Sequence, residues 1–202
     1  MHQDLPSPGN ETSFLSQEGI AMIETDRLLV RPFRDSDYRD LYEYLSLEET
    51  YRYEPGNPVS LEEARKITEE RVNKANWWAV ILKDDINDKL IGHISLFQSE
   101  PDVFRTWEIG YIFNPVFQNK GYCTEAARVV INYTFKELNA HRIVAYCNPE
   151  NISSTRVLEK CGMTREGLRR KNAFFRTDDK GDPLWFDSCE YALLANEKDE
   201  KL

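Results

Sequence analysis

The sequence predicts an α/β protein in which a mixed, mostly antiparallel sheet carries helices on both faces. Short runs of alternating apolar and polar residues are typical of strands, and other segments repeat apolar residues at helical spacing. The order strand, helix, strand over residues 107–147 predicts a crossover that joins two parallel strands. With 202 residues, 41% of them hydrophobic, the chain can bury the core of one domain.

The chain divides into three predicted parts. Residues 1–21 are rich in Ser, Pro, Gly, Asn and Gln, which predicts a loosely ordered leader with a short ordered piece around Phe14. Residues 22–195 form the folded domain. Residues 196–202 form a charged tail that we expect to be frayed.

The domain opens with a predicted strand over residues 25–33, which Pro32 confines to a sheet edge or a strand end. Asp35 or Ser36 is the expected N-cap of a first helix, because apolar residues follow it at helical spacing. A loop over residues 51–60, with two prolines and a glycine, ends this part of the domain.

The second helix is predicted from Ser60 to about Lys74, and its start resembles a capping box one step out of the ideal register. Strands and helices then alternate to the end of the domain. Strands are predicted over residues 77–82, 90–97, 107–113, 142–147 and 185–194 and at Phe174-Phe175, and helices over residues 122–138 and 151–161.

The most informative stretch is the turn from Gln118 to Ala126, between the strand over residues 107–113 and the helix that follows. The first amide groups of a helix have no helical acceptor, and the helix dipole adds positive potential there. Gly121 lets a ligand approach the main chain closely. The turn therefore predicts an anion site whose natural ligand is a phosphate or a diphosphate.

Charge and composition argue against several classes of function. A net charge of −9 argues against a nucleic-acid partner. No apolar run approaches the roughly 18 residues of a membrane span, and the N-terminus lacks the pattern of a signal peptide. The four cysteines form no Cys-x-x-Cys pair, the three histidines are scattered, and we expect no metal site. Free thiols suit a cytoplasmic protein.

Four motifs follow one another along the chain. They are residues 25–33, Trp107–Tyr111, Gln118-x-x-Gly121-x-Cys123, and Asn151-x-x-Ser154 with the residues up to Met163. In this order they resemble the GNAT superfamily of acyl-CoA-dependent N-acetyltransferases. Within it, the chain is most similar to the RimJ/RimL-like branch, which includes the ribosomal-protein N-terminal acetyltransferases. The resemblance covers residues 23–194 and implies an acyl-CoA N-acyltransferase domain whose central parallel strands splay apart.

The resemblance implies that the cofactor is acetyl-CoA and that CoA is a product. Loop amides would hold the diphosphate, Lys120 could add charge attraction, and the pantetheine arm would pair with the main chain near Ile112 and Phe113. Asn151 caps its helix and could also bond that arm. The expected cofactor-binding residues are Ile112, Phe113, Gln118, Asn119, Lys120, Gly121, Tyr122, Cys123, Thr124, Asn151 and Ser154.

Two side chains are the catalytic candidates. Glu108 matches the family's general-base position, and an acceptor amine must lose its proton before it attacks. The other interpretation of Glu108 is a solvated carboxylate paired with an arginine. Ser154, one helical turn after Asn151, is the candidate that holds or protonates the departing sulfur, and a surface serine is its alternative.

Two positions depart from the family pattern. Cys123 replaces Gly or Ala, and its amide can still bind a ligand. Because a helix N-terminus lowers a thiol pKa, Cys123 is also the one cysteine for which we expect reactivity, without a catalytic role. Leu158 stands where many members carry a Tyr that protonates the thiolate, so we expect that role to move to Ser154.

The predicted activity is direct acetyl transfer to a primary amine, on a protein N-terminus or a small molecule, by a monomer or homodimer. The acceptor pocket is expected from Phe33, the first two helices, the loop over residues 51–60 and the hairpin Phe174–Trp185. Acidic residues there suit a cationic acceptor, and solvated loop charges explain them equally well. A non-catalytic acyl-CoA-binding module is one alternative. A nucleotide-binding domain is another, against which the missing Gly-x-x-x-x-Gly-Lys-Ser/Thr motif argues.

Overall fold

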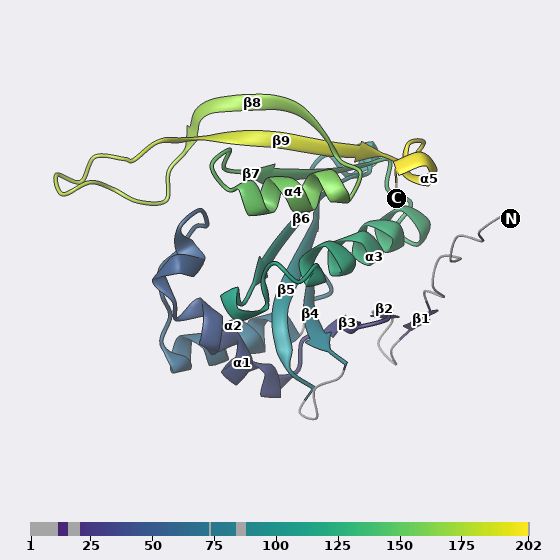
Figure 1. Cartoon of the computed structure of the whole chain (residues 1–202), viewed down its shortest axis with the longest axis horizontal. Helices are drawn as coiled ribbons and strands as arrows, with labels where there is room; N and C mark the ends of the chain where they lie inside the picture. The colour runs from purple at the N-terminus through teal and green to yellow at the C-terminus, as the bar shows by residue number, and fades with distance from the viewer. Residues whose placement is uncertain (1–11, 16–20, 73, 84–87, 202) are drawn as a thin grey trace, which may run out of the picture.

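The computed structural model describes residues 12–15, 21–72, 74–83 and 88–201 (Figure 1). Within these ranges the strands form one nine-stranded sheet in the order β1-β2-β3-β4-β5-β6-β7-β9-β8. Each neighbouring pair is antiparallel except β6 and β7, which are parallel and confirm the predicted crossover. The strands are β1 (Thr12–Leu15), β2 (Ala21–Glu24), β3 (Leu28–Pro32), β4 (Trp77–Leu82), β5 (Leu90–Gln98), β6 (Thr106–Phe113), β7 (Arg142–Cys147), β8 (Thr164–Ala173) and β9 (Phe186–Leu194).

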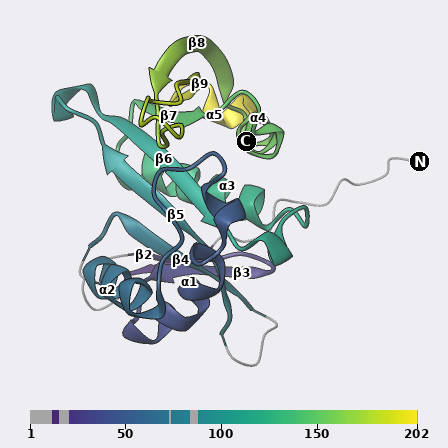
Figure 2. The same cartoon turned by 90° about the vertical axis from the view of Figure 1, so that its left-hand side faces the viewer.

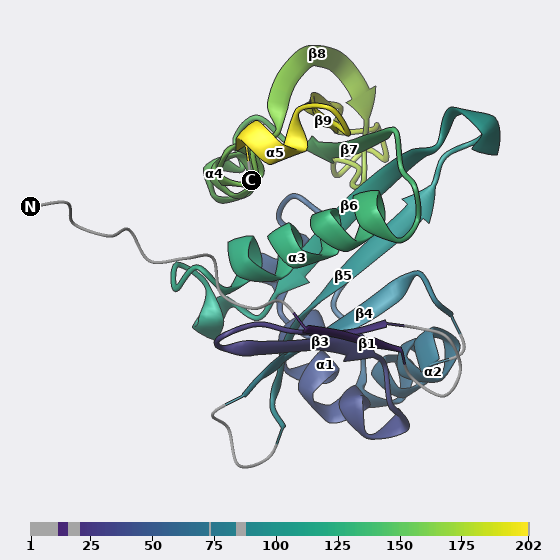
Figure 3. The same ribbon diagram turned by 90° about the vertical axis from the view of Figure 1, so that its right-hand side faces the viewer.

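Helices cover both faces of the sheet, as Figures 2 and 3 show. On one face, α1 (Tyr38–Leu45) and α2 (Leu61–Val72) pack over a buried cluster that includes Leu41 and Tyr44. On the other face, α3 (Tyr122–Lys136) and α4 (Ile152–Lys160) cover a larger cluster. Because helices bury both faces, β4 and β5 are almost continuously apolar instead of alternating.

The two parallel strands separate soon after they begin. β6 pairs with β7 only at Thr106, Trp107 and Glu108, although β6 continues to Phe113. Figure 1 shows β6 turning away from β7, which runs on with β9 and β8 across the top of the view. The remainder of β6 therefore has an edge without a strand partner, and this opening positions the candidate site.

The last hairpin differs from the sequence prediction. Phe174 and Phe175 were expected to form a strand, but they follow the end of β8 at Ala173. The strand itself, TREGLRRKNA, is rich in charged residues and mostly exposed. It is an edge strand that pairs with β9 alone, so no second neighbour imposes the apolar alternation that reveals a buried strand.

Two helix starts also differ from expectation. The carboxylate that serves the start of the first helix belongs to Asp37, not to Asp35 or Ser36. It accepts a 2.8 Å hydrogen bond from the Arg34 amide and forms a buried ion pair with Arg31. At α2, Ser60 and Glu63 form a capping box in the regular register, with the Ser60 amide donating to the Glu63 carboxylate at 2.7 Å.

The two ends of the chain are only partly described. Much of the expected leader, residues 1–11 and 16–20, lies outside the described residues, but Phe14 lies in β1, which pairs with β2. The tail carries one helical turn, α5 (Lys198–Lys201), and Lys201 donates to Thr164 at 3.0 Å. The division of the chain at residues 21 and 195 stays a prediction.

Candidate active site

A cavity of about 430 Å³ lies at the opening beside β6. One side, which we call the glycine wall, consists of the end of β6, the loop at Gly121 and one side of α4 with its cap Asn151. The other side, which we call the loop wall, consists of Glu49, Thr50, Arg52, Tyr53 and Glu54. This volume is in the range of small-molecule binding sites.

The Gly121 loop presents unpaired amide groups to the cavity. Gly121 is the left-handed N-cap of α3, with φ at 83°, and the first helical bond runs from the Glu125 amide to the Gly121 carbonyl at 3.0 Å. Among the described residues, the amides of Tyr122, Cys123 and Thr124 donate to no acceptor. A Cβ at Gly121 would meet only the Arg27 guanidinium, at 3.4 Å, so the surface is open to a ligand. These features suit an anion such as a diphosphate.

An ionic clamp holds this loop against the beginning of β3. The Glu125 carboxylate accepts bonds from the Thr25 hydroxyl at 2.6 Å and from Arg27 Nε at 2.7 Å. The Arg27 guanidinium also donates to the Lys120 carbonyl at 3.1 Å and lies 4.6 Å from the centre of the Tyr122 ring. Sequence reasoning missed Arg27 and Glu125. Arg27 lies in the first motif and Glu125 in the turn from Gln118 to Ala126, so the structure explains the first motif by its contact with that turn.

The exposed edge of β6 offers main-chain groups to the cavity. The Asn114 amide donates to Ile91 in β5, and Ser99 donates to Thr106, so even-numbered residues of β6 point their main chain toward β5. The odd-numbered residues Tyr111 and Phe113 therefore direct main-chain groups toward the opening, and Ile112 also belongs to the cavity lining. Gln118 Nε2 donates a hydrogen bond of 3.0 Å to the Phe113 carbonyl.

Ser154 and Tyr111 meet where α4 approaches β6. The Tyr111 hydroxyl lies 3.0 Å from Ser154 Oγ and donates to the Ser154 carbonyl at 3.2 Å. Burial raises the pKa of Tyr111 well above its usual range, so the hydroxyl keeps its proton. Asn151 caps α4 as predicted, accepting from the Ser154 amide at 3.1 Å. Leu158 is buried in the core and does not line the cavity, whereas Ser154 does.

Glu108 lies at the closed end of the opening, not in the lining of the cavity. It is the last residue of β6 that pairs with β7, and strand alternation places it on the face opposite Tyr111. Its side chain is exposed, yet partial burial of the carboxylate raises its pKa, with Arg169 opposing the shift. No described residue forms an ion pair with Glu108, since Arg169 pairs with Glu190 at 2.7 Å.

The loop wall is fixed by hydrogen bonds on the α1 side of the sheet. The buried Tyr51 side chain donates to the Leu45 carbonyl at 3.0 Å, and Thr50 donates to the Tyr44 carbonyl at 2.5 Å. Arg176, from the hairpin between β8 and β9, donates to the Tyr51 carbonyl at 2.8 Å. The hairpin thus supports this wall from behind and supplies no lining residue, contrary to expectation.

Phe33, also expected in the pocket, does not reach it. Its side chain is 3% exposed and packs with Leu41 and Tyr51 in the core under α1 and α2. Its apolar neighbours exclude it from a solvent-accessible lining. The loop wall of the cavity is therefore formed by residues 49–54 and not by the end of the first strand.

Glu54 is the most perturbed carboxylate of the loop wall. Burial raises its pKa to about 7. No hydrogen bond or ion pair joins it to another described residue. The sequence contained Glu54 as one of several acidic residues of the loop over residues 51–60, and nothing in its spacing distinguished it.

Cys123 does not have the reactive thiol that its position predicted. Burial raises the pKa of its thiol well above the usual range, and the nearby Cys161 adds to the shift. The side chain packs against the larger core cluster, so desolvation outweighs the helix dipole. Lys120 is not among the residues that line the cavity, and its Nζ lies 5.4 Å from the centre of the Phe117 ring. Positive charge in the lining comes instead from Arg52, Arg156 and Lys160.

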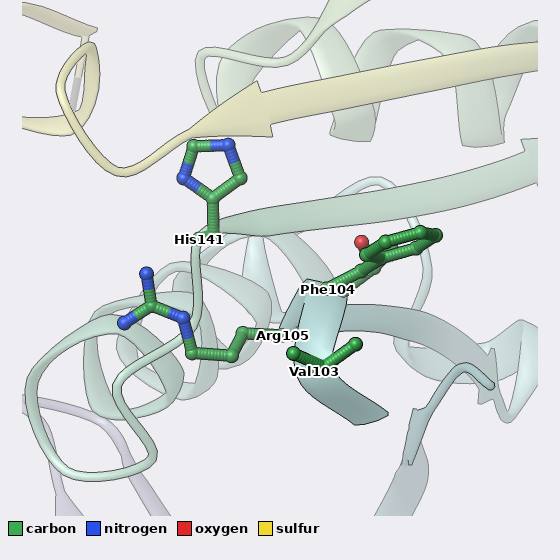
Figure 4. A pocket seen from close by; sticks show the side chains of 5 residues that line it. Val103, Phe104, Arg105 and His141 are labelled. Carbon is green, nitrogen blue, oxygen red and sulfur yellow. The ribbon is translucent and has the colours of Figure 1, made fainter. Parts of the chain in front are cut away.

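A second hollow lies at the other end of β6. Val103, Phe104, Arg105, Thr106 and His141 line it, and Figure 4 shows Arg105 and His141 extending from neighbouring segments. It has no carboxylate and no row of unpaired helix amides. The hollow therefore lacks the features that the cavity beside Gly121 combines.

Two further observations concern the described part of the chain. No group of three or more His, Cys, Asp or Glu side chains there is arranged to hold a metal ion. No helix in those residues is long and apolar enough to cross a membrane. His93 is buried and bonded to the Tyr44 hydroxyl at 2.6 Å, away from the cavity, as expected of a structural histidine.

Comparison with known proteins gives concordant results. Residues 27–164 match the family described as "Acetyltransferase (GNAT) domain". YnaD of Bacillus subtilis (strain 168), an uncharacterized N-acetyltransferase, is 42% identical over 176 residues, which are 87% of this chain and 98% of YnaD. The crystal structure of a GNAT-family acetyltransferase from Bacillus anthracis is 38% identical, covers 87% of this chain and 99% of its own, and has a TM-score of 0.78.

One more distant structure contains ligands. It is the spermidine N-acetyltransferase from Vibrio cholerae in complex with CoA and spermine, 20% identical, with a TM-score of 0.69. It covers 86% of this chain and 99% of its own. At this identity the likeness shows that the two chains share a fold.

Proposed function

The chain belongs to the GNAT acetyltransferase family and is an N-acetyltransferase, and we propose that it transfers an acetyl group from acetyl-CoA directly to a primary amine. The observation that carries the proposal is the row of unpaired amides at Gly121, which open into a cavity shared with Ser154, Tyr111 and Glu54. Acetyl-CoA supplies the activated acyl group as a thioester.

The glycine wall is the part that holds CoA in this proposal. The amides of Tyr122, Cys123 and Thr124 bind the diphosphate, and the α3 dipole adds to the attraction. Arg156 and Lys160 supply cations on the same side of the cavity. The edge of β6 at Tyr111 and Phe113 pairs with the amide groups of the pantetheine arm, which fills the place that β7 leaves vacant.

Ser154 and Tyr111 serve the sulfur when the thioester breaks. The Ser154 hydroxyl donates a hydrogen bond to the leaving thiolate. The Tyr111 hydroxyl, 3.0 Å from Ser154 Oγ, holds Ser154 in place and can donate a proton to Oγ when Ser154 gives its own to the sulfur. Leu158 has no group that can donate a proton, so this pair takes the place of the tyrosine that the resemblance leads one to expect. Asn151 positions Ser154 through the helix cap.

Glu108, which the resemblance implies as the base, is one of two carboxylates that we propose as alternatives for that role, and the other lies in the loop wall. A raised pKa makes this carboxylate a stronger base than an ordinary glutamate. With a strand rise of about 3.3 Å, Glu108 lies about 10 Å along β6 from Tyr111, so a water molecule would have to carry the proton to it.

The acceptor is proposed to be a cationic primary amine. The loop wall contributes the carboxylates Glu49 and Glu54 to the cavity. Related proteins suggest two kinds of acceptor: the Vibrio cholerae enzyme is named for spermidine, and a fold relative from Vibrio fischeri is named for an alanine of ribosomal protein S5. The second would agree with the RimJ/RimL-like branch. The free cysteines suit a reducing cytoplasm, where we propose that the enzyme acts.

An acceptor screen tests the proposal. Purified protein with acetyl-CoA is offered spermidine, an amino sugar and a hexapeptide with an N-terminal alanine, and free CoA is measured with a thiol reagent. Acetyl transfer is confirmed by the mass of the product. Release of CoA with at least one amine supports the proposal. CoA binding without transfer to any amine would instead favour the non-catalytic acyl-CoA-binding module.

A further inference from the structure

The loop wall places a carboxylate across the cavity from the group that serves the sulfur. Glu54 lies on the α1 side of the sheet, where Tyr51 packs in the same cluster as Ile112. Ser154 and Tyr111 lie on the α4 side. All three of Glu54, Ser154 and Tyr111 line the one cavity. An acceptor that enters from the loop wall thus reaches Glu54 before it reaches the glycine wall.

Glu54 has no partner that would explain its place. Among the described residues neither a cation nor an amide bonds its carboxylate. An unpaired, largely buried carboxylate is unfavourable unless a ligand cation joins it or it takes up a proton. Both outcomes occur when an ammonium group binds and then transfers its proton.

The other charged groups of the cavity leave this carboxylate uncompensated. Glu49 and Arg52 belong to the same segment, and Arg156 and Lys160 line the cavity from α4. The titratable hydroxyls and thiol of the lining are those of Tyr53, Tyr111, Tyr122 and Cys123. Burial alone raises the pKa of Glu54 to about 7, so the group changes charge in the neutral range.

The wall that carries Glu54 is built to stay in place. Three hydrogen bonds fix its neighbours: Tyr51 to Leu45, Thr50 to Tyr44, and Arg176 to Tyr51. Gly56, with φ at 102°, lets the chain pass close to the Tyr51 ring. A carboxylate held this way can meet a substrate at a defined position.

We propose that Glu54 binds the ammonium group of the acceptor and removes its proton. This inference rests on the proposed function. The proton moves from nitrogen to the Glu54 carboxylate, and the neutral nitrogen forms a bond to the acyl carbon. The carbon–sulfur bond breaks, and the sulfur takes a second proton from the nitrogen by way of Ser154. Glu54 then returns its proton to solvent, so the reaction releases one proton in total.

The experiment measures kcat/KM for the best amine of the screen from pH 5.5 to 9.5 in four proteins. They are wild type, Glu54→Gln, Glu108→Gln and the control Glu48→Gln, which changes an exposed glutamate outside the cavity lining. At pH 7 we expect Glu54→Gln to lower kcat/KM about 100-fold or more. The wild-type profile should level off above about pH 7, whereas the variant should keep rising as free amine accumulates.

Two further measurements separate this role from a structural one. Calorimetry should give Glu54→Gln the same CoA affinity as wild type, because Glu54 is not part of the glycine wall. Glu54→Asp keeps the carboxylate and should retain the levelling of the profile at a lower rate. A variant that fails to bind CoA has lost its fold, and Glu54→Asp then decides the question: an unchanged rate and profile would overturn the inference.

The remaining outcomes distinguish the two proposals. If wild type acetylates an amine and Glu54→Gln stays within threefold of it at every pH, the inference fails and the proposed function stands. If Glu108→Gln abolishes the levelling and Glu54→Gln does not, Glu108 is the base and the inference is also overturned. If wild type releases no CoA with any amine, both proposals fail together.

Discussion

The two walls of the cavity are built from different parts of the chain. The glycine wall consists of helix N-termini and a strand edge, and it offers main-chain groups whose directions the fold fixes. The loop wall is an irregular segment between α1 and α2, and it offers charged side chains. A shared cofactor needs a constant binding surface, while an acceptor needs one that can vary, and loops vary more readily than regular elements.

The difference should be visible in variants, because damage to the glycine wall should affect CoA, and damage to the loop wall should affect the acceptor. Each kinetic or binding variant below has a matched control elsewhere in the chain, and the stability variant is compared at two pH values. Binding of CoA and the KM for the acceptor are the two quantities that separate the walls.

The largest effect is expected from Gly121→Ala. Its φ of 83° is unfavourable for a side chain, and relief of that strain would turn the loop amides away from the diphosphate. We expect CoA to bind about 100-fold more weakly by calorimetry, since hydrogen bonds to a charged group contribute about 1.5–3 kcal/mol each. Gly181→Ala is the control, with φ at 86° in the β8–β9 hairpin. A similar loss of affinity in both variants would contradict this role of the loop.

A smaller effect is expected where the glycine wall meets the sulfur. Ser154→Ala should lower kcat about 10-fold and leave the CoA dissociation constant within about threefold, because it removes one proton donor. Tyr111→Phe should also lower kcat, but by a smaller factor, since Tyr111 acts through Ser154. Tyr133→Phe, on α3 and outside the cavity lining, is the control. Unchanged kcat in both site variants would exclude this pair from catalysis.

The support of the loop wall can be removed from a distance. Arg176→Ala deletes the 2.8 Å bond to the Tyr51 carbonyl and should loosen the wall without touching CoA. We expect the acceptor KM to rise about threefold to tenfold, in line with the loss of about 1 kcal/mol for a hydrogen bond, with unchanged CoA affinity. Lys180→Ala, exposed in the same hairpin, should change neither. Weaker CoA binding in Arg176→Ala would mean that the two walls are not independent.

The smallest effect is expected on thermal stability, where Glu54→Gln should raise the melting temperature instead of lowering it. In the folded protein burial raises the pKa of Glu54 from 4.5 to about 7. The folded state therefore holds a proton that the unfolded state loses, and stability falls as the pH rises through this window. Glu54→Gln should melt about 2–4 °C above wild type at pH 8, with no gain at pH 4. A gain that is equal at both pH values would exclude titration of Glu54 as its cause.

The sequence predicted the glycine wall better than the loop wall, for a physical reason. A tight turn at Gly121, a cap at Asn151 and a crossover between parallel strands are local features, and each leaves a mark on the residues that form it. The pairing of Tyr111 with Ser154 depends on two segments 43 residues apart, and no local pattern encodes it. The environment of Glu54 depends on burial by distant segments, so the sequence showed only an acidic loop.

The errors in the fold have similar causes. β8 was missed because an exposed edge strand needs no apolar alternation. Its arginines and lysines leave no pattern from which a strand could be predicted. Phe33 was expected in the pocket, but packing under α1 and α2 buries it. Cys123 was expected to be reactive from its helix N-terminus, and tertiary burial reverses the sign of the pKa shift.

A crystal structure with CoA bound tests the central claim most directly. We expect diphosphate oxygens within about 3 Å of the amide nitrogens of Tyr122, Cys123 and Thr124. The pantetheine arm should lie along the free edge of β6 and end at Ser154, with the loop wall left clear for the acceptor. A diphosphate that lies elsewhere, with these three amides facing only water, would contradict the account.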